Sequence, residues 1–210
     1  MREISLCNQA IRLSTVAVVA PPPAHAAMTG LPPMMAAKAG RKSPMTMYSI
    51  SKQLLGLAAC FAVCFFTAGI GAVASSNAPS FYRLLEQPGW APPGWLFGPV
   101  WTLLFSMMAI SAWLVWRARG FSGARLGLLL FAAQLIVNAL WSWLFFAFQM
   151  GAAALLDIAL LWMLITATIC AFWSIHRFAA LLLVPYLAWV SFAGALNWAL
   201  LLRNPALLAQ

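Results

Sequence analysis

The sequence has very few ionisable side chains. Only three of its 210 residues are acidic, Glu3, Glu86 and Asp157, and charged residues make up 7% of the chain against 64% hydrophobic residues. A soluble domain carries several times more charge on its surface. No two carboxylates lie near each other in the sequence to share acid and base chemistry. The composition therefore excludes a soluble domain and argues against a hydrolytic enzyme.

Histidine and cysteine are scarce as well. His25 lies near the N-terminus and His176 in a short turn, so neither can be paired with a nucleophile and a carboxylate on sequence grounds. The four cysteines show no CxxC spacing, which argues against a zinc site or a disulfide. We therefore predict no catalytic residues, no metal site and no required cofactor, and we expect Cys60 and Cys64 to pack as small apolar residues.

Long apolar runs dominate what remains. About 20 residues of helix cross the hydrocarbon core of a bilayer, which is about 30 Å thick. The chain from Ile50 onward holds five such runs separated by short turns, which would make consecutive helices antiparallel. We predict an all-α integral membrane protein, a five-transmembrane-helix bundle with spans at residues 50–74, 96–116, 124–148, 152–174 and 178–202.

The two ends of the chain differ from this membrane domain, which we place at residues 48–203. Residues 1–44 carry several prolines, and their only apolar run, Leu13 to Ala20, is too short to span a membrane. The segment resembles a secretory signal only loosely, and Met45 and Met47 lie just before the first span. We interpret it as a disordered leader or a misassigned start, and residues 204–210 as a tail.

The formal net charge of +9 could indicate a nucleic-acid protein, but the basic residues lie between apolar runs and not on one solvated face. Lysines and arginines instead gather before the first span and after the second, as cytoplasmic loops do. We expect a lipid bilayer and no nucleic acid as partner. The distribution predicts an N-terminus inside the membrane-bounded compartment and a C-terminus outside.

Polar residues inside the spans recur at helical spacing. In span three, Gln134, Asn138 and Trp141 lie on one face, and in span five a second face is formed. That second face comprises Tyr186, Trp189, Ala193 and Asn197, preceded by Pro185. Two readings remain open: the faces hydrogen-bond to each other between helices, or they line a ligand pocket.

Two further features of the spans allow more than one interpretation. Asp157 lies more than one turn inside span four, where it is either hydrated near the interface, bonded to a neighbouring helix, or facing a wet cavity. Trp95, Trp113, Trp116 and Trp173 are placed as an interfacial belt. Three others, Trp141, Trp162 and Trp189, lie deeper and either fill the core or wall a pocket for a flat ligand.

The loop after span one, FYRLLEQPGWAPPGWLFGPVWTLLF, resembles the TspO/MBR family of tryptophan-rich sensory proteins, which includes the mitochondrial translocator protein. Its pattern of Trp and Pro residues is followed by Gly-Pro-x-Trp at a helix start, and the polar faces of spans three and five match the family in the same order. The resemblance covers residues 48–203. The motif residues of the loop are Trp90, Pro92, Pro93, Trp95, Gly98 and Pro99, and those of spans three and five include Gln134, Pro185, Tyr186 and Asn197.

This resemblance implies a five-helix bundle, commonly a homodimer, with a pocket under the loop of residues 75–95. Family members bind porphyrins and other tetrapyrroles, isoquinoline-type drugs and, in the mitochondrial branch, cholesterol. Carried over to this chain, the ligand-binding residues would be Phe81, Tyr82, Trp101, Phe105, Asn138, Trp141, Trp189 and Ala193.

Some positions depart from the family pattern. Phe105 stands where the family often has Tyr, and Phe81 and Gly89 stand where some bacterial members have Trp. These changes weaken the case for polar anchoring of a porphyrin and for its Trp-dependent photochemical degradation. Trp198 replaces the Tyr of the proposed sterol motif, so we do not predict cholesterol binding.

The leading hypothesis from the sequence is therefore a membrane-embedded sensor or carrier of a tetrapyrrole such as porphyrin or haem. A transporter is the alternative, and it would produce net ligand flux through vesicles. A light-dependent porphyrin-degrading enzyme would require intact Trp101, Trp141 and Trp189. A membrane scaffold would bind no porphyrin tightly.

Overall fold

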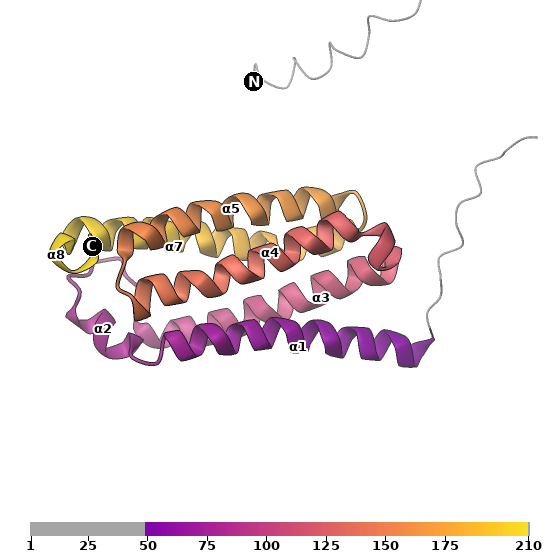
Figure 1. Ribbon diagram of the computed structural model, residues 1–210, viewed down its shortest axis with the longest axis horizontal. Helices are drawn as coiled ribbons and strands as arrows, with labels where there is room; N and C mark the ends of the chain where they lie inside the picture. The colour runs from indigo at the N-terminus through magenta and orange to yellow at the C-terminus, as the bar shows by residue number, and fades with distance from the viewer. Residues whose placement is uncertain (1–48, 210) are drawn as a thin grey trace, which may run out of the picture. The chain divides into compact units, whose positions relative to one another are not determined.

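The computed structural model describes residues 49–209, and within this range the chain is helical without strands (Figure 1). The long helices are α1 (Ile50–Ala74), α3 (Phe97–Gly123), α4 (Arg125–Ser142), α5 (Gly151–Trp173) and α7 (Val184–Arg203). Five helical stretches are long and apolar enough to cross a membrane. The predicted five-span fold is therefore confirmed, whereas our interpretation of residues 1–44 falls outside the described residues.

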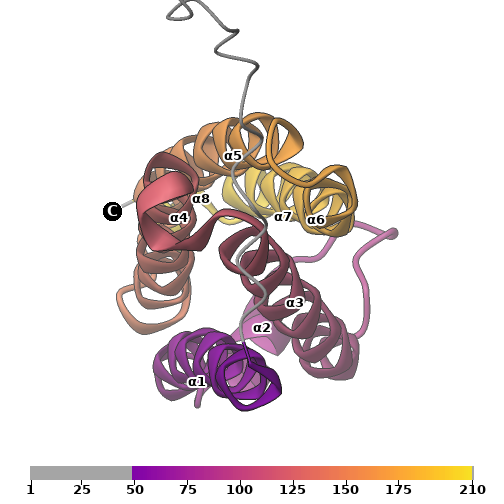
Figure 2. The same ribbon diagram turned by 90° about the vertical axis from the view of Figure 1, so that its right-hand side faces the viewer.

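The helices form a bundle in which α1 lies at one side. Helix α1 packs against α3 and α4, α5 packs between α4 and α7, and the short helix α6 (Arg177–Leu182) packs against α3 and α5 (Figure 2). Only Cys64, Thr67 and Ala74 of α1 are buried. Most of the surface of α1 therefore faces outward, and its inner face forms a wall of the bundle.

Two predicted spans contain backbone breaks. The second span continues past the predicted end at Trp116 to Gly123, interrupted at Gly120, where a φ of 64° favours glycine. The fifth is divided into α6 and α7 at Leu183, just before Pro185, whose ring and missing N–H prevent a continuous helix. Span three ends in a π-helical turn, η2 (Trp143–Ala147).

The loop between α1 and α3 is structured. It contains α2 (Ala78–Leu84), as the sequence indicated for the stretch around Phe81, and a single 3-10 turn, η1 (Gly94–Leu96). At the same end of the bundle, the chain after residue 203 forms α8 (Pro205–Leu208). We set these residues apart as a tail, yet Leu208 is fully buried. A Cβ atom at position 151 would lie only 2.8 Å from the Cβ atom of Leu208. Glycine at this position therefore leaves room for α8 to pack against the start of α5.

The main core joins α3, α4, α5, α6 and α7 through buried apolar residues such as Met108, Ile165 and Phe172. A second cluster beneath the loop contains Phe81, Tyr82 and Leu208. Close contact between α1 and α3 depends on Gly56, because a Cβ there would overlap the ring of Trp116. These contacts hold α1 and the loop against the bundle and define the space between them.

Candidate functional site

A cavity of about 590 Å³ lies under the loop, between α1, α3 and α4. Its walls come from the last three turns of α1, from α2, from the start of α3, and from the end of α4 with η2. The volume is in the range of binding pockets for small molecules. Every side chain lining it is uncharged, and most are aromatic or small, so the cavity suits an apolar ligand.

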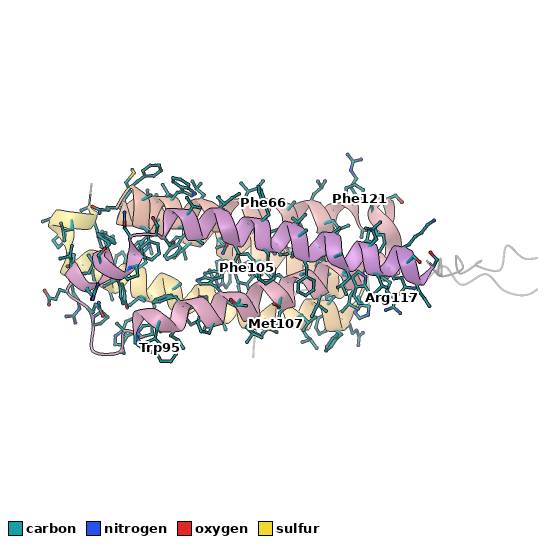
Figure 3. All side chains as sticks on the ribbon, turned by 90° about the horizontal axis from the view of Figure 1, so that it is seen from below. Phe66, Trp95, Phe105, Met107, Arg117 and Phe121 are labelled. Carbon is teal, nitrogen blue, oxygen red and sulfur yellow. The ribbon has the colours of Figure 1, made fainter. Side chains whose placement is uncertain are left out.

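Five of the eight predicted ligand-binding residues line this cavity. They are Tyr82 from the loop, Trp101 and Phe105 from α3, and Asn138 and Trp141 from α4. The rings of Trp101 and Phe105 lie 5.6 Å apart, and Phe105 is placed between α1 and α3 (Figure 3). The structure thus brings together residues separated by almost 60 positions in the sequence.

The other three predicted residues do not line the main cavity. Phe81 is buried in the cluster beneath the loop, with its ring 6.1 Å from that of Phe145. Trp189 lies behind the wall, with its ring 5.9 Å from that of Phe97, which does line the cavity. Ala193 lines a separate space of about 20 Å³ that shares Tyr82 and Trp141 with the main cavity. The structure therefore places these three residues outside the walls of the main cavity.

The motif residues of the loop fix its path. The Tyr82 hydroxyl donates a hydrogen bond to the Pro92 carbonyl at 3.2 Å, and burial raises the pKa of this phenol above its usual value. Trp90 lies edge-on to Phe192, with ring centres 5.8 Å apart. Trp95 points away from the bundle and is 73% exposed, as expected for an interfacial tryptophan (Figure 3). The Trp and Pro residues therefore position Tyr82 over the cavity.

The two polar faces predicted on spans three and five meet inside the bundle. Asn138 Nδ2 donates a hydrogen bond to the Tyr186 hydroxyl at 3.1 Å, and the ring of Tyr186 lies 6.1 Å from that of Trp101. Because Asn138 also lines the cavity, both interpretations of these faces hold at this residue: it bonds a neighbouring helix and contributes a polar group to the wall. The buried Nε1 of Trp141 has no hydrogen-bond acceptor.

The cavity reaches the outer surface of the bundle between α1 and α3. Five of its lining residues on these two helices are exposed: Phe65, Gly69 and Ala72 on α1, and Gly98 and Thr102 on α3. Gly69, Ala72 and Gly98 have small side chains or none, which leaves the seam open there. The seam lies between two helices that are long and apolar enough to span a membrane.

Sequence reasoning missed the contribution of α1. Thr67, Ala68, Gly71, Ala72 and Ser75 line the cavity and repeat at intervals of three and four residues. This stripe of small residues was the available signal, but such stripes occur in many spans without a pocket. A cavity forms here because small residues on α1 face large aromatic residues on α3 and α4.

Two other predicted positions have clear places. Asp157 is buried, with 7% of its surface exposed, so the reading that it stays hydrated near the interface does not hold. Trp162 is 42% exposed and donates a hydrogen bond to the Ser191 hydroxyl on α7, so it walls no pocket. The spacing of apolar residues could not show that this indole faces outward, because α5 itself carries apolar residues on all of its faces.

Comparison with known proteins gives consistent matches. The TspO/MBR family model matches residues 57–203. The chain is 43% identical over 161 residues to the tryptophan-rich protein TspO of Chlorobaculum tepidum, covering 74% of this chain and 100% of that protein. It is 40% identical over 149 residues to protein CrtK of Rhodobacter capsulatus, covering 69% and 90%. Identity to the human translocator protein is 38% over 120 residues, covering 56% and 71%.

Proposed function

The chain belongs to the TspO/MBR family of multi-pass membrane proteins, and we propose that it senses or carries a tetrapyrrole such as protoporphyrin or haem in the cavity beneath its loop. The observation that carries this proposal is the uncharged aromatic cavity of about 590 Å³ that joins Tyr82, Trp101, Phe105, Asn138 and Trp141. Relatives are named sensory protein and translocator protein, in keeping with a binding function.

The chemistry of the walls favours a large, flat and apolar ligand. Burial of apolar ring surface contributes about 25 cal/mol per Å² before the costs of binding are subtracted, so affinity would come mainly from the aromatic walls. Asn138 is the polar residue best placed to orient the ligand, because its Nδ2 bonds Tyr186 while its carbonyl oxygen forms no hydrogen bond with a described residue.

Titration of the purified protein with protoporphyrin IX tests this function. Porphyrin absorbance reports the affinity, and tryptophan quenching reports proximity. We expect saturable binding near one ligand per chain, weakened at least about tenfold in Trp101→Ala because an aromatic wall is lost. Trp198→Ala is the matched control, since Trp198 is 53% exposed and lies outside the cavity walls. Equal affinity in both variants and the parent protein would refute the site.

Transport is the second candidate, and the seam between α1 and α3 favours it. A ligand that enters from the lipid could leave by the same seam or toward the aqueous end near the loop. Reconstituted vesicles loaded with porphyrin would then release it faster than vesicles without protein. Gly98→Leu should slow this release because its side chain extends into the exposed seam, where a Cβ at Gly98 meets no atom within 4 Å. Saturable binding without release would favour a sensor.

Two other readings have their own tests. A light-dependent porphyrin-degrading enzyme would change the bound spectrum on illumination only while Trp101, Trp141 and Trp189 are intact. A scaffold would fold normally and bind no porphyrin.

The predicted orientation, with the N-terminus inside, and the predicted homodimer are separate proposals. Protease access in sealed vesicles tests the orientation, and light scattering of the purified protein tests the oligomeric state.

A further inference from the structure

Asp157 is the only carboxylate within the five spans, and it lies inside the bundle. It follows Gly151 by six residues, which places it about 9 Å along α5 from the helix start. Only 7% of its surface is exposed, and its Oδ2 has no hydrogen-bond partner. An ionised carboxylate in such a place costs several kcal/mol unless a positive charge compensates it.

No side chain between residues 49 and 209 is paired with it to supply that positive charge. Among the described residues, the basic side chains of the membrane helices lie at helix ends: Lys52, Arg117, Arg119, Arg125, Arg177 and Arg203. The only ion pair in the described range joins Arg203 to Glu86 on the exposed loop, at 3.3 Å. On the elements packed against α5, Arg125 and Arg177 lie at the end of the bundle opposite the start of α5 (Figure 1). Arg203, at the end of α7, lies at the same end as Gly151 and is paired with Glu86.

Other buried groups of the bundle are polar but neutral. Tyr186 on α7 and Cys64 on α1 are both fully buried. Helix α4 contributes no ionisable group beyond Arg125, but its Gln134 is fully buried with neither amide atom bonded. Asn197 on α7 is 1% exposed and also unbonded. Helix α6 has no ionisable group beyond Arg177, and η2 has none.

We propose that Asp157 is a proton-binding site inside the bilayer, at which the carboxylate takes up one proton from the aqueous phase and is held as the neutral acid at neutral pH. The step forms one O–H bond and breaks none in the protein. The neutral acid offers one donor and one acceptor and carries no charge that the bundle must compensate. The nearest end of α5, at Gly151, provides the shorter route to water.

Asp157 is the only aspartate in the sequence, which makes the test unusually direct. Protein made with ¹³C-labelled aspartate carboxyl gives one side-chain carboxyl resonance, assigned by its loss in Asp157→Asn. We expect the chemical shift of a neutral acid at neutral pH, changing to that of a carboxylate only in alkaline solution. Labelled glutamate gives the reference, because Glu86 is an exposed carboxylate paired with Arg203.

A carboxylate shift at neutral pH would overturn the proposal, and a shift that changes on replacing sodium by choline would identify an alkali-metal site in its place. The Asp157→Asn variant is nearly isosteric and neutral, so it should fold and unfold at a temperature close to that of the parent protein. A large loss of stability in this variant would also contradict a neutral Asp157. Neither measurement uses porphyrin, so the result is independent of the proposed ligand.

Discussion

The side chain of Asn204 forms two hydrogen bonds with the backbone of Glu86, 118 positions earlier in the sequence. Its Oδ1 accepts from the Glu86 N–H at 2.8 Å, and its Nδ2 donates to the Glu86 carbonyl at 3.1 Å and to the Leu200 carbonyl at 2.9 Å. One amide at the end of α7 thus fastens the loop that covers the cavity.

Replacing Asn204 with Ala should loosen this loop. The Glu86 N–H and carbonyl would lose their protein partners, which we expect to lower loop stability by about 1–3 kcal/mol. Hydrogen exchange should become faster in residues 78–93 and stay unchanged in α5. Arg203→Gln is the control: its ion pair with Glu86 is exposed, and such pairs contribute about 0–1 kcal/mol. Equal exchange in both variants would contradict a fastening role for Asn204.

Tyr82 should make the loop sensitive to alkaline pH. Because burial raises its pKa above the ordinary tyrosine value of about 10, the neutral phenol is favoured in the folded loop. Its contribution to stability is complete below pH 10 and is lost as the pH rises through the raised value. Hydrogen exchange of the loop should therefore accelerate above pH 10 in the parent protein. Tyr82→Phe should show fast exchange at neutral pH and no such alkaline step.

Two glycines of α1 should respond oppositely to the same change. A Cβ at Gly56 overlaps the Trp116 ring, whereas a Cβ at Gly69 meets no atom within 4 Å. Gly56→Ala should lower the unfolding temperature because α1 must move away from α3, at a cost of about 1–3 kcal/mol. Gly69→Ala should leave the temperature unchanged or raise it slightly, since alanine favours helix. Similar losses in both would argue against the α1 and α3 packing described here.

Substitution of a residue in the cavity wall should lower porphyrin affinity more than substitution of a residue behind the wall. Trp101 lines the cavity, whereas Trp189 does not and packs against the wall residue Phe97 from behind. We expect Trp101→Phe to reduce affinity more than Trp189→Phe, by about threefold to tenfold, as aromatic contacts are individually modest. Absorbance titration measures the difference. A larger loss in Trp189→Phe would place the ligand nearer to Ala193 and the smaller space beside it.

The sequence by itself determined the class of the protein. Few charged residues and five apolar runs can only be accommodated in lipid, because the surface of a soluble domain needs polar groups. Proline and glycine positions indicated the ends and breaks of the spans, as at Pro185, because these residues act on the backbone locally. The helical spacing of Asn138 and Tyr186 placed each on an inner face, and the structure joins those faces by a hydrogen bond.

Only the tertiary structure decided which inner residues share a cavity. Spacing gives the face of a helix but not its rotation against its neighbours, so Trp189 and Ala193 could not be separated from Trp101 in advance. The wall from α1 depends on small side chains whose role appears only opposite Trp101 and Phe105. The fastening of the loop by Asn204 and the isolation of Asp157 likewise depend on distant contacts, because burial and pairing are properties of the packed bundle.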